Sequence, residues 1–264
     1  MFINPGTRMN NFDVKNKFGE DRIGEIYLAN DMNLGITVAL KVINPLLTSD
    51  PQFVKRLEQE ARILNSIIHS NIVQLYKFFI YQDKFIMVLE YAEGITLKQL
   101  ISQIGPIPEE RAMRIFKQLC DGLTYAHNKG VIHRNINPSN IMIDEKDNIK
   151  IMGFGIAELM GDEGLIRTGA KIEKLYYMSP EQINAEEGID QRSDIYSMAI
   201  MLFEMLSGKL PFDISTKSDF ILMNSIVNVN LPDLRVNFPS ISDETVRGCC
   251  IVNYIFSRNL FKKR

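Results

Sequence analysis

The stretch Val131-Ile-His-Arg-Asn-Ile-Asn-Pro-Ser-Asn-Ile-Met-Ile143, followed by Lys150-Ile-Met-Gly-Phe-Gly155, decides the fold of this chain. We expect two short apolar strands to flank the polar loop, with Gly-Phe-Gly directly after the second strand. A histidine or an arginine in a loop is unremarkable by itself. The ordered pattern His-Arg-x-x-x-Pro-x-Asn followed by Phe-Gly is hard to obtain by chance, so this stretch carries the strongest signal in the sequence.

The bulk composition bounds the class of protein. The chain has 264 residues, 45% of them apolar and 23% charged, which is enough for one large soluble domain or two small ones. The net charge of −2 gives no reason to expect a nucleic-acid or anionic-membrane partner. The three cysteines, Cys120, Cys249 and Cys250, form no disulfide framework. Together with the lack of a signal peptide or a membrane-length apolar run, they predict a cytoplasmic protein.

The first third of the chain has the pattern of a small sheet with one helix. Residues 1–11 are polar and predict a loose tail, and residues 12–43 alternate like an antiparallel meander. Residues 72–80 and 84–91 add two more strands, which makes five. Between them a helix begins at Asp50-Pro51, an N-cap followed by a proline at the first helical position. Its expected apolar face consists of Phe53, Leu57, Ala61, Leu64 and Ile68.

After Tyr91 the pattern becomes helical. We expect a short helix over Thr96–Ile101, a long one from Pro108 to its stop at Gly130, a buried apolar one over Asp194–Ser207, and a further one over 218–227. Residues 158–174 lack periodicity and predict a mobile loop.

These features together resemble a known family. His133, Arg134 and Asn140 match the H-R-D-x-x-x-x-N loop of protein kinases, and Phe154-Gly155 matches the end of D-F-G. Met178-Ser-Pro-Glu181 resembles the A-P-E segment, and Arg192-Ser-Asp-Ile-Tyr-Ser197 resembles the start of the central helix of the large lobe.

From about Phe12 to about Val246 the chain resembles a bacterial-type Ser/Thr protein kinase domain. The resemblance implies an α+β, bilobal fold with a small antiparallel-sheet lobe over 12–91 and a mainly helical lobe over 92–248. Residues 249–264 no longer follow the family and predict a divergent or truncated end. The resemblance also implies that Asp194 bonds the backbone near His133, and that nucleotide binds between the lobes.

The first nucleotide-binding candidates lie in the small lobe. Gly19 and Gly24 match two glycines of the loop that covers nucleotide phosphates, but Asp21 replaces the middle one and should repel phosphate unless it turns outward. Val38-Ala-Leu-Lys41 resembles V-A-I-K, in which the lysine holds the α- and β-phosphates and pairs with a helix glutamate, here Glu60. The alternatives are an ordinary hairpin and a solvated strand lysine.

The segment Met87-Val-Leu-Glu-Tyr-Ala-Glu-Gly94 resembles the hinge between kinase lobes. In isolation it is equally consistent with a strand that enters a turn. The resemblance implies that the backbone of Glu90 and Ala92 meets the edge of the adenine ring, and that the Leu89 side chain guards the pocket behind it. Three apolar side chains would sandwich the ring, namely Ile26, Ala39 and Met142.

The catalytic positions depart from the family. Asn135 stands where the catalytic aspartate is expected, Asn137 where a lysine neutralises the transferring phosphate, and Gly153 where an aspartate binds magnesium. Asn140 remains as a neutral ligand that cannot be expected to hold Mg²⁺ alone, so the departures argue against a magnesium site. Lys174 replaces the threonine that usually touches the catalytic aspartate.

These departures predict a pseudokinase: a kinase-like domain that binds ATP weakly or binds a protein partner, with phosphoryl transfer lost or strongly impaired. One alternative is an active Ser/Thr kinase that transfers the ATP γ-phosphate to a protein substrate through an atypical metal site. Another is a degraded remnant without function.

Overall fold

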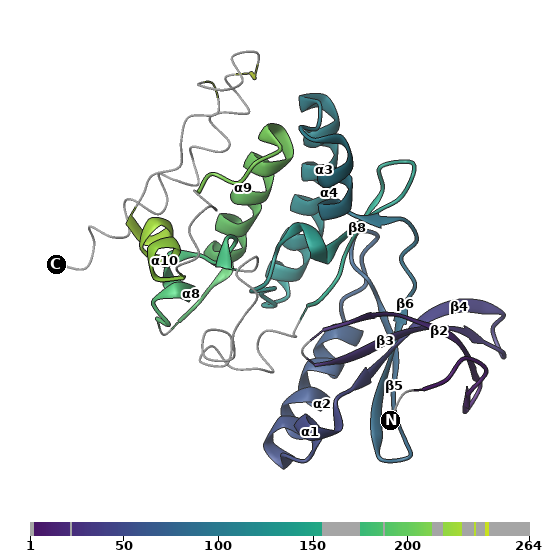
Figure 1. Ribbon diagram of the computed structural model, residues 1–264. Helices are drawn as coiled ribbons and strands as arrows, with labels where there is room; N and C mark the ends of the chain where they lie inside the picture. The colour runs from purple at the N-terminus through teal and green to yellow at the C-terminus, as the bar shows by residue number, and fades with distance from the viewer. Residues whose placement is uncertain are drawn as a thin grey trace. The chain divides into compact units, whose positions relative to one another are not determined.

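The computed structural model describes residues 3–21, 23–154, 175–186, 188–212, 219–228, 235 and 241–242 (Figure 1). It divides into two compact units, Met1–Glu93 and Gly94–Arg264. The expected mobile loop over 158–174 and the divergent end over 249–264 lie outside the described residues, as do Gly155 and Lys174.

The first unit is built on one antiparallel sheet. Its strands are β1 (Arg8–Met9), β2 (Phe12–Glu20), β3 (Gly24–Asp31), β4 (Ile36–Ile43), β5 (Leu75–Tyr81) and β6 (Lys84–Glu90). Their order across the sheet is β1-β2-β3-β4-β6-β5. The five strands expected from the sequence are therefore present, and β1 is an addition.

The core of the sheet explains that addition. Residues 1–11 were expected as a loose tail, but Met9 is buried and packs with Phe12 and Val14 against the inner face of the sheet. The Gly6 amide also donates to the Val14 carbonyl at 2.8 Å. Burial of one large apolar side chain stabilises by roughly 1.5–3 kcal/mol, which together with the hydrogen bonds to β2 offsets part of the entropy lost on ordering this segment. The tail prediction was wrong for this part of the segment.

Two helices accompany the sheet. The short α1 (Pro45–Thr48) precedes α2 (Pro51–Asn65), and Asp50 caps α2 by accepting a hydrogen bond from the Gln52 amide at 2.9 Å. The predicted start is thus confirmed, and α2 packs against β5. Ile68 does not belong to its apolar face: the helix ends at Asn65, and Ile68 is 62% exposed.

The second unit contains a small antiparallel sheet in the order β7-β8-β9. The strands are β7 (Ile95–Thr96), β8 (Ile141–Ile143) and β9 (Ile149–Ile151), and the 3₁₀ turn η1 (Pro138–Asn140) leads into β8. The strand expected before the polar loop does not form, because Val131 and Ile132 have no ladder partner among the described residues. The backbone amides that follow them bond a side chain instead, as described below.

Helices make up most of the rest of the second unit. They are α3 (Leu97–Ile104), α4 (Glu109–Asn128), α8 (Pro180–Ile183), α9 (Gln191–Ser207) and α10 (Asp219–Asn228). α4 and α9 pack together, and α9 is buried on nearly every side, as its apolar sequence predicted. Within the described ranges, no helix is both long enough and apolar enough to span a bilayer.

Candidate functional site

The polar loop of the second unit is anchored by one buried carboxylate. Asp194, in the first turn of α9, is completely buried. Its Oδ1 accepts from the Arg134 amide at 2.7 Å, and its Oδ2 accepts from the His133 amide at 2.8 Å. His127 Nε2 lies 2.7 Å from the same Oδ2. The expected bond from Asp194 to the backbone near His133 is confirmed, and these bonds replace a strand ladder before the loop.

The imidazole of His133 is a structural element of the loop. Burial lowers the pKa of His133, which favours the neutral ring. Its partners assign the tautomer: Nε2 donates to the Met152 carbonyl at 2.8 Å, and Nδ1 accepts from the Asn135 amide at 3.2 Å. The ring also meets Phe154 edge-on, with centroids 4.5 Å apart. His133 therefore joins the loop to the segment that carries Gly153, and it is not placed as a proton carrier.

Three asparagines close the loop on itself. Asn137 Nδ2 donates to the Asn135 carbonyl at 2.9 Å and to Asn135 Oδ1 at 3.1 Å. Asn140 Nδ2 donates to the same Asn135 carbonyl at 2.8 Å. Asn137 Oδ1 in turn accepts from the Ser139 amide at 3.0 Å. All of these groups are neutral amides, so the bonds fix the loop's shape and supply neither a base nor a charge.

The two positions at which kinases hold magnesium do not fit that ion. Gly153 has no side chain, and Asn140 offers one neutral oxygen while its amide nitrogen is engaged by Asn135. Mg²⁺ prefers anionic oxygen ligands in strict octahedral geometry. A Cβ built on Gly153 would make an ordinary contact with Asn140 Nδ2 at 3.4 Å, but the backbone φ of +87° would strain any side chain there.

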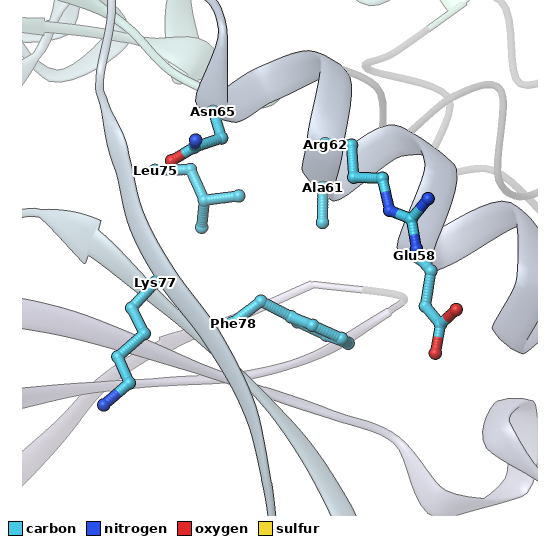
Figure 2. Close-up of a pocket in the computed structure, with 7 residues that line it drawn as sticks. All are labelled: Glu58, Ala61, Arg62, Asn65, Leu75, Lys77 and Phe78. Atoms are coloured by element: carbon cyan, nitrogen blue, oxygen red, sulfur yellow. The ribbon is translucent and has the colours of Figure 1, made fainter.

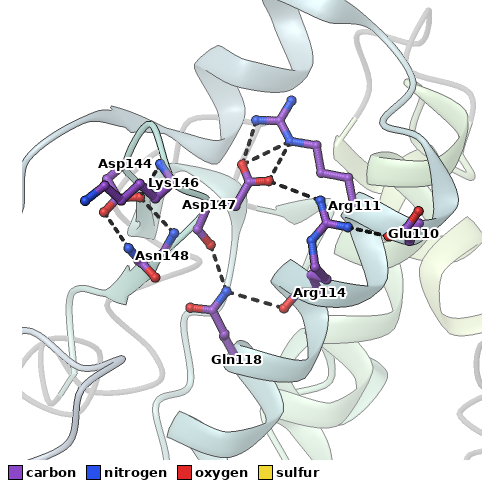
Figure 3. Close-up of polar contacts among 8 residues, drawn as sticks. All are labelled: Glu110, Arg111, Arg114, Gln118, Asp144, Lys146, Asp147 and Asn148. Atoms are coloured by element: carbon purple, nitrogen blue, oxygen red, sulfur yellow. Dashed lines mark hydrogen bonds and ion pairs between the residues drawn. The ribbon is translucent and has the colours of Figure 1, made fainter.

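Helix α4 clamps the hairpin that joins β8 to β9 (Figure 3). Arg111 Nη2 and Nε donate to Asp147 Oδ1 at 2.7 and 3.0 Å. Gln118 donates to the Asp147 carbonyl at 2.7 Å and accepts from the Ile149 amide at 3.1 Å. The hairpin is thus fixed at its turn and at its return strand, which positions the residues before β8 and after β9.

In the first unit the strand register gathers the candidate nucleotide-binding residues on one sheet face. Ile26 lies opposite Lys41, and Ala39 lies opposite Leu89. Residues opposite one another in an antiparallel pair, and residues two apart along a strand, share a face. Gly19 pairs with Ile26 and so joins the same face. The alternate residues, such as Leu40 and Val88, point into the core described above.

Lys41 pairs with Asp21, so the predicted ion pair between Lys41 and Glu60 was wrong. Lys41 Nζ donates to Asp21 Oδ2 at 2.5 Å, rather than forming the expected ion pair with Glu60. The Lys41 side chain is 3% exposed and that of Asp21 is 27% exposed. Burial lowers the pKa of Lys41, and the Asp21 carboxylate opposes that shift. Asp21 therefore turns toward the lysine, whereas phosphate binding would require it to turn outward.

The same aspartate organises the turn between β2 and β3. Asp21 Oδ1 accepts from the Ile23 amide at 2.9 Å and from the Gly24 amide at 3.0 Å. Sequence reasoning missed this role, although an aspartate followed three residues later by glycine is a typical turn signal. Gly24 is needed for close packing, because a Cβ there would lie 2.0 Å from the Val42 carbonyl oxygen. A Cβ on Gly19 would have its nearest neighbour at 3.9 Å.

The hinge candidates lie at the end of β6. The Glu90 amide donates to the Gln74 carbonyl at 2.8 Å, so this N–H is already engaged within the first unit. Leu89, Glu90 and Ala92 are half-buried. Met142 belongs to β8 of the second unit and is half-buried there.

The segment around Glu181 has a partner that the sequence did not suggest. Ser193 Oγ, from α9, donates to Glu181 Oε1 at 2.5 Å. Gln182 Nε2 donates to the Arg134 carbonyl at 2.8 Å, which ties α8 to the polar loop. The roles of Ser193 and Gln182 were not predicted from any motif in the sequence.

A cavity of about 420 Å³ lies between α2 and β5 (Figure 2). None of the residues predicted to bind nucleotide lines it. Its wall combines charged and apolar side chains, namely Glu58, Ala61, Arg62, Asn65, Leu75, Lys77 and Phe78.

Comparison with known proteins identifies the family. The sequence matches the family model described as "Protein kinase domain" over residues 12–252. This chain belongs to the protein kinase family. The kinase domain is 34% identical over 230 residues to "Serine/threonine-protein kinase PrkC" of Bacillus subtilis (strain 168), a match that covers 87% of this chain and 34% of that protein.

A further relative agrees with this assignment, and a solved structure agrees with the fold. The kinase domain is 36% identical over 207 residues to "Serine/threonine-protein kinase PknB" of Mycolicibacterium smegmatis, which covers 76% of this chain and 33% of that protein. Its fold is similar to that of a point mutant of the Mycobacterium tuberculosis PknI kinase domain, with a TM-score of 0.70 at 22% identity and coverage of 94% and 91%. The chain spans about one third of the length of the curated relatives.

Proposed function

We propose that this kinase domain is a pseudokinase, which acts by binding a nucleotide or a protein partner and does not transfer phosphate at a useful rate. One observation carries the proposal: the loop at Asn135, Asn137 and Asn140 is closed by bonds between neutral amides. At the two places where the family uses carboxylates, the chain has Asn135 and Gly153.

The chemical cost of these replacements is large. A positioned general base contributes about 10²–10⁴-fold to the rate of the catalysed reaction, and an amide cannot act as one. Phosphoryl transfer depends mainly on positioning and on metal ions that neutralise the developing charge. A donor set of one neutral amide supports neither requirement, so both losses act in the same direction.

A nucleotide remains a reasonable ligand for this domain. The shared sheet face of Ile26, Ala39 and Leu89 offers apolar surface for an adenine ring, and the hinge backbone around Ala92, just beyond the end of β6, would meet the edge of the base. Lys41, on the same face, would be the residue to meet a phosphate. We propose adenine-nucleotide binding at these residues, with low affinity.

The second candidate is an active Ser/Thr protein kinase. The buried anchor at Asp194 and the His133–Phe154 contact support this alternative, because they keep the loop in a fixed shape. Such an enzyme would need carboxylates from elsewhere in the chain to hold its metal.

A transfer assay tests the proposal. The domain is incubated with γ-labelled ATP, Mg²⁺ or Mn²⁺, and a generic basic protein, beside the variant Lys41→Ala. We expect label incorporation to be the same for both proteins. Magnesium-dependent incorporation that Lys41→Ala abolishes would establish the active enzyme and refute the pseudokinase.

A thermal-shift titration completes the test. We expect ATP to raise the melting temperature equally with Mg²⁺ and with a chelator, because no carboxylate at positions 135 or 153 couples the metal to the nucleotide. A shift that requires Mg²⁺ would contradict the proposal.

A further inference from the structure

We propose that Asp21 is an internal occupant of the phosphate subsite, so that this domain prefers an uncharged adenine nucleoside over ATP. The inference rests on the proposed nucleotide site and names its ligand class. It is carried by the contacts of one side chain, all of them within the first unit.

Asp21 engages the donors that a phosphate would need. Its Oδ2 takes the Lys41 ammonium at 2.5 Å, and its Oδ1 takes the amides of Ile23 at 2.9 Å and Gly24 at 3.0 Å. Backbone amides of a turn together with a lysine are the groups that typically cradle a phosphate in proteins. Here a carboxylate of the chain fills that cradle.

Because Lys41 is buried, its pairing with Asp21 determines the charge that a phosphate would meet. Its side chain is 3% exposed, so its charge is shielded from water and depends on a nearby anion. With Asp21 in place the pair is neutral, and a phosphate would find a negative carboxylate where it needs a positive field. An incoming triphosphate has to displace Asp21 and then remain close to it.

A nucleoside meets no such obstacle. Adenosine needs the apolar face of Ile26, Ala39 and Leu89 and the edge of the hinge, and it brings no charge to Lys41. The structure thus separates the site into a base-binding part and a phosphate-binding part that is already satisfied.

A purely structural role for Asp21 is the alternative, because aspartate commonly stabilises such turns. The two roles use different oxygens, which makes them separable by substitution. In Asp21→Asn the remaining Oδ1 can still accept from the Ile23 and Gly24 amides. The new amide nitrogen cannot accept a bond from Lys41, so the substitution removes the competition with phosphate and leaves the buried ammonium without its anion while it keeps the turn.

The test is a set of calorimetric titrations with adenosine, with ATP in the presence of EDTA, and with inorganic tripolyphosphate. The proteins are the unaltered chain, Asp21→Asn, and the matched control Glu20→Gln, which removes an exposed neighbouring carboxylate that pairs with Lys17. Asp21→Gly, which restores the glycine of the family pattern, serves as a second variant. Circular dichroism melts verify that each protein is folded.

We expect the unaltered chain to bind adenosine at least as tightly as ATP. Asp21→Asn should tighten ATP binding by about tenfold, equivalent to about 1.4 kcal/mol, and leave adenosine within about twofold. Asp21→Gly should behave likewise, and Glu20→Gln should leave both affinities within about twofold.

Three results would overturn the inference: an unaltered chain that prefers ATP over adenosine by more than about tenfold, equal gains in Asp21→Asn and Glu20→Gln, or no gain for ATP or tripolyphosphate in either Asp21 variant. These results are independent of the transfer assay. Phosphate transfer by the unaltered chain would refute the pseudokinase and leave the role of Asp21 to be decided by the titrations.

Discussion

Replacing the buried carboxylate of Asp194 by an amide should unfold the domain at markedly lower denaturant concentration. The carboxylate accepts from the Arg134 amide through Oδ1 and from the His133 amide and His127 through Oδ2, and it is completely buried. Asp194→Asn has one acceptor oxygen, so in either orientation its NH₂ group faces a backbone N–H.

The size of the effect follows from that count. Leaving one buried donor without an acceptor costs about 1–3 kcal/mol, and hydrogen bonds to a charged group contribute about 1.5–3 kcal/mol each. We therefore expect Asp194→Asn to lower the free energy of unfolding by about 2–4 kcal/mol. At about 2–4 °C per kcal/mol for a domain of this size, the melting temperature should fall by roughly 4–16 °C.

The measurement is urea denaturation followed by far-UV circular dichroism, because the chain has no tryptophan. Asp190→Asn is the matched control: Asp190 caps the same helix, its side chain is 45% exposed, and asparagine is an equally good N-cap. We expect the control to change stability by less than about 0.5 kcal/mol. A loss below about 1 kcal/mol for Asp194→Asn, or equal losses for both variants, would refute the reasoning.

Three further predictions use other contacts. Gly24→Ala should lower the melting temperature strongly, because its Cβ would lie 2.0 Å from a backbone carbonyl oxygen. Gly19→Ala should have little effect in the same melt, and similar shifts of the melting temperature for the two variants would contradict this prediction. Arg111→Lys should lose the forked contact with Asp147 in the β8–β9 turn. We expect the free energy of unfolding to fall by about 1 kcal/mol and hydrogen exchange in that hairpin to become faster. Unchanged exchange would refute this prediction. Burial raises the pKa of Cys120 from 9.0 to about 11. In a variant whose other two cysteines are replaced by serine, the alkylation rate of Cys120 should therefore rise with a midpoint near pH 11. A midpoint near pH 9 would refute this prediction. Because the folded state favours the neutral thiol of Cys120, the free energy of unfolding should keep its full value below pH 9 and should fall as the pH rises toward 11.

Local patterns in the sequence predicted the parts of the fold that depend on local chemistry. The start of α2 was predictable because an aspartate N-cap and a following proline act within one helical turn. The anchor at Asp194 was predictable only through the resemblance to kinases, since 61 residues separate it from His133. Nothing in the local sequence of either residue indicates that contact.

The choice of partner for Lys41 could not be predicted in the same way. Asp21 and Glu60 both carry carboxylates, and the sequence does not say which one the lysine meets. The strand register decides, because Ile26 pairs with Lys41 and places the turn at Asp21 just beyond it. The prediction of a loose tail was wrong at Met9 for a related reason, because the burial of Met9 depends on a core assembled from distant strands.

The backbone at Gly153 decides what a side chain at this position would cost. Its φ of +87° lies in the region that favours glycine, and among other residues aspartate and asparagine tolerate that region best. A Cβ there meets only ordinary contacts with Asn140. Gly153→Asp would therefore add a carboxyl group without a steric clash but with a strained backbone, and a β-branched residue would be strained further. A carboxylate placed at position 153 would thus carry a conformational cost that the backbone sets, and crowding by Asn140 would add little to it.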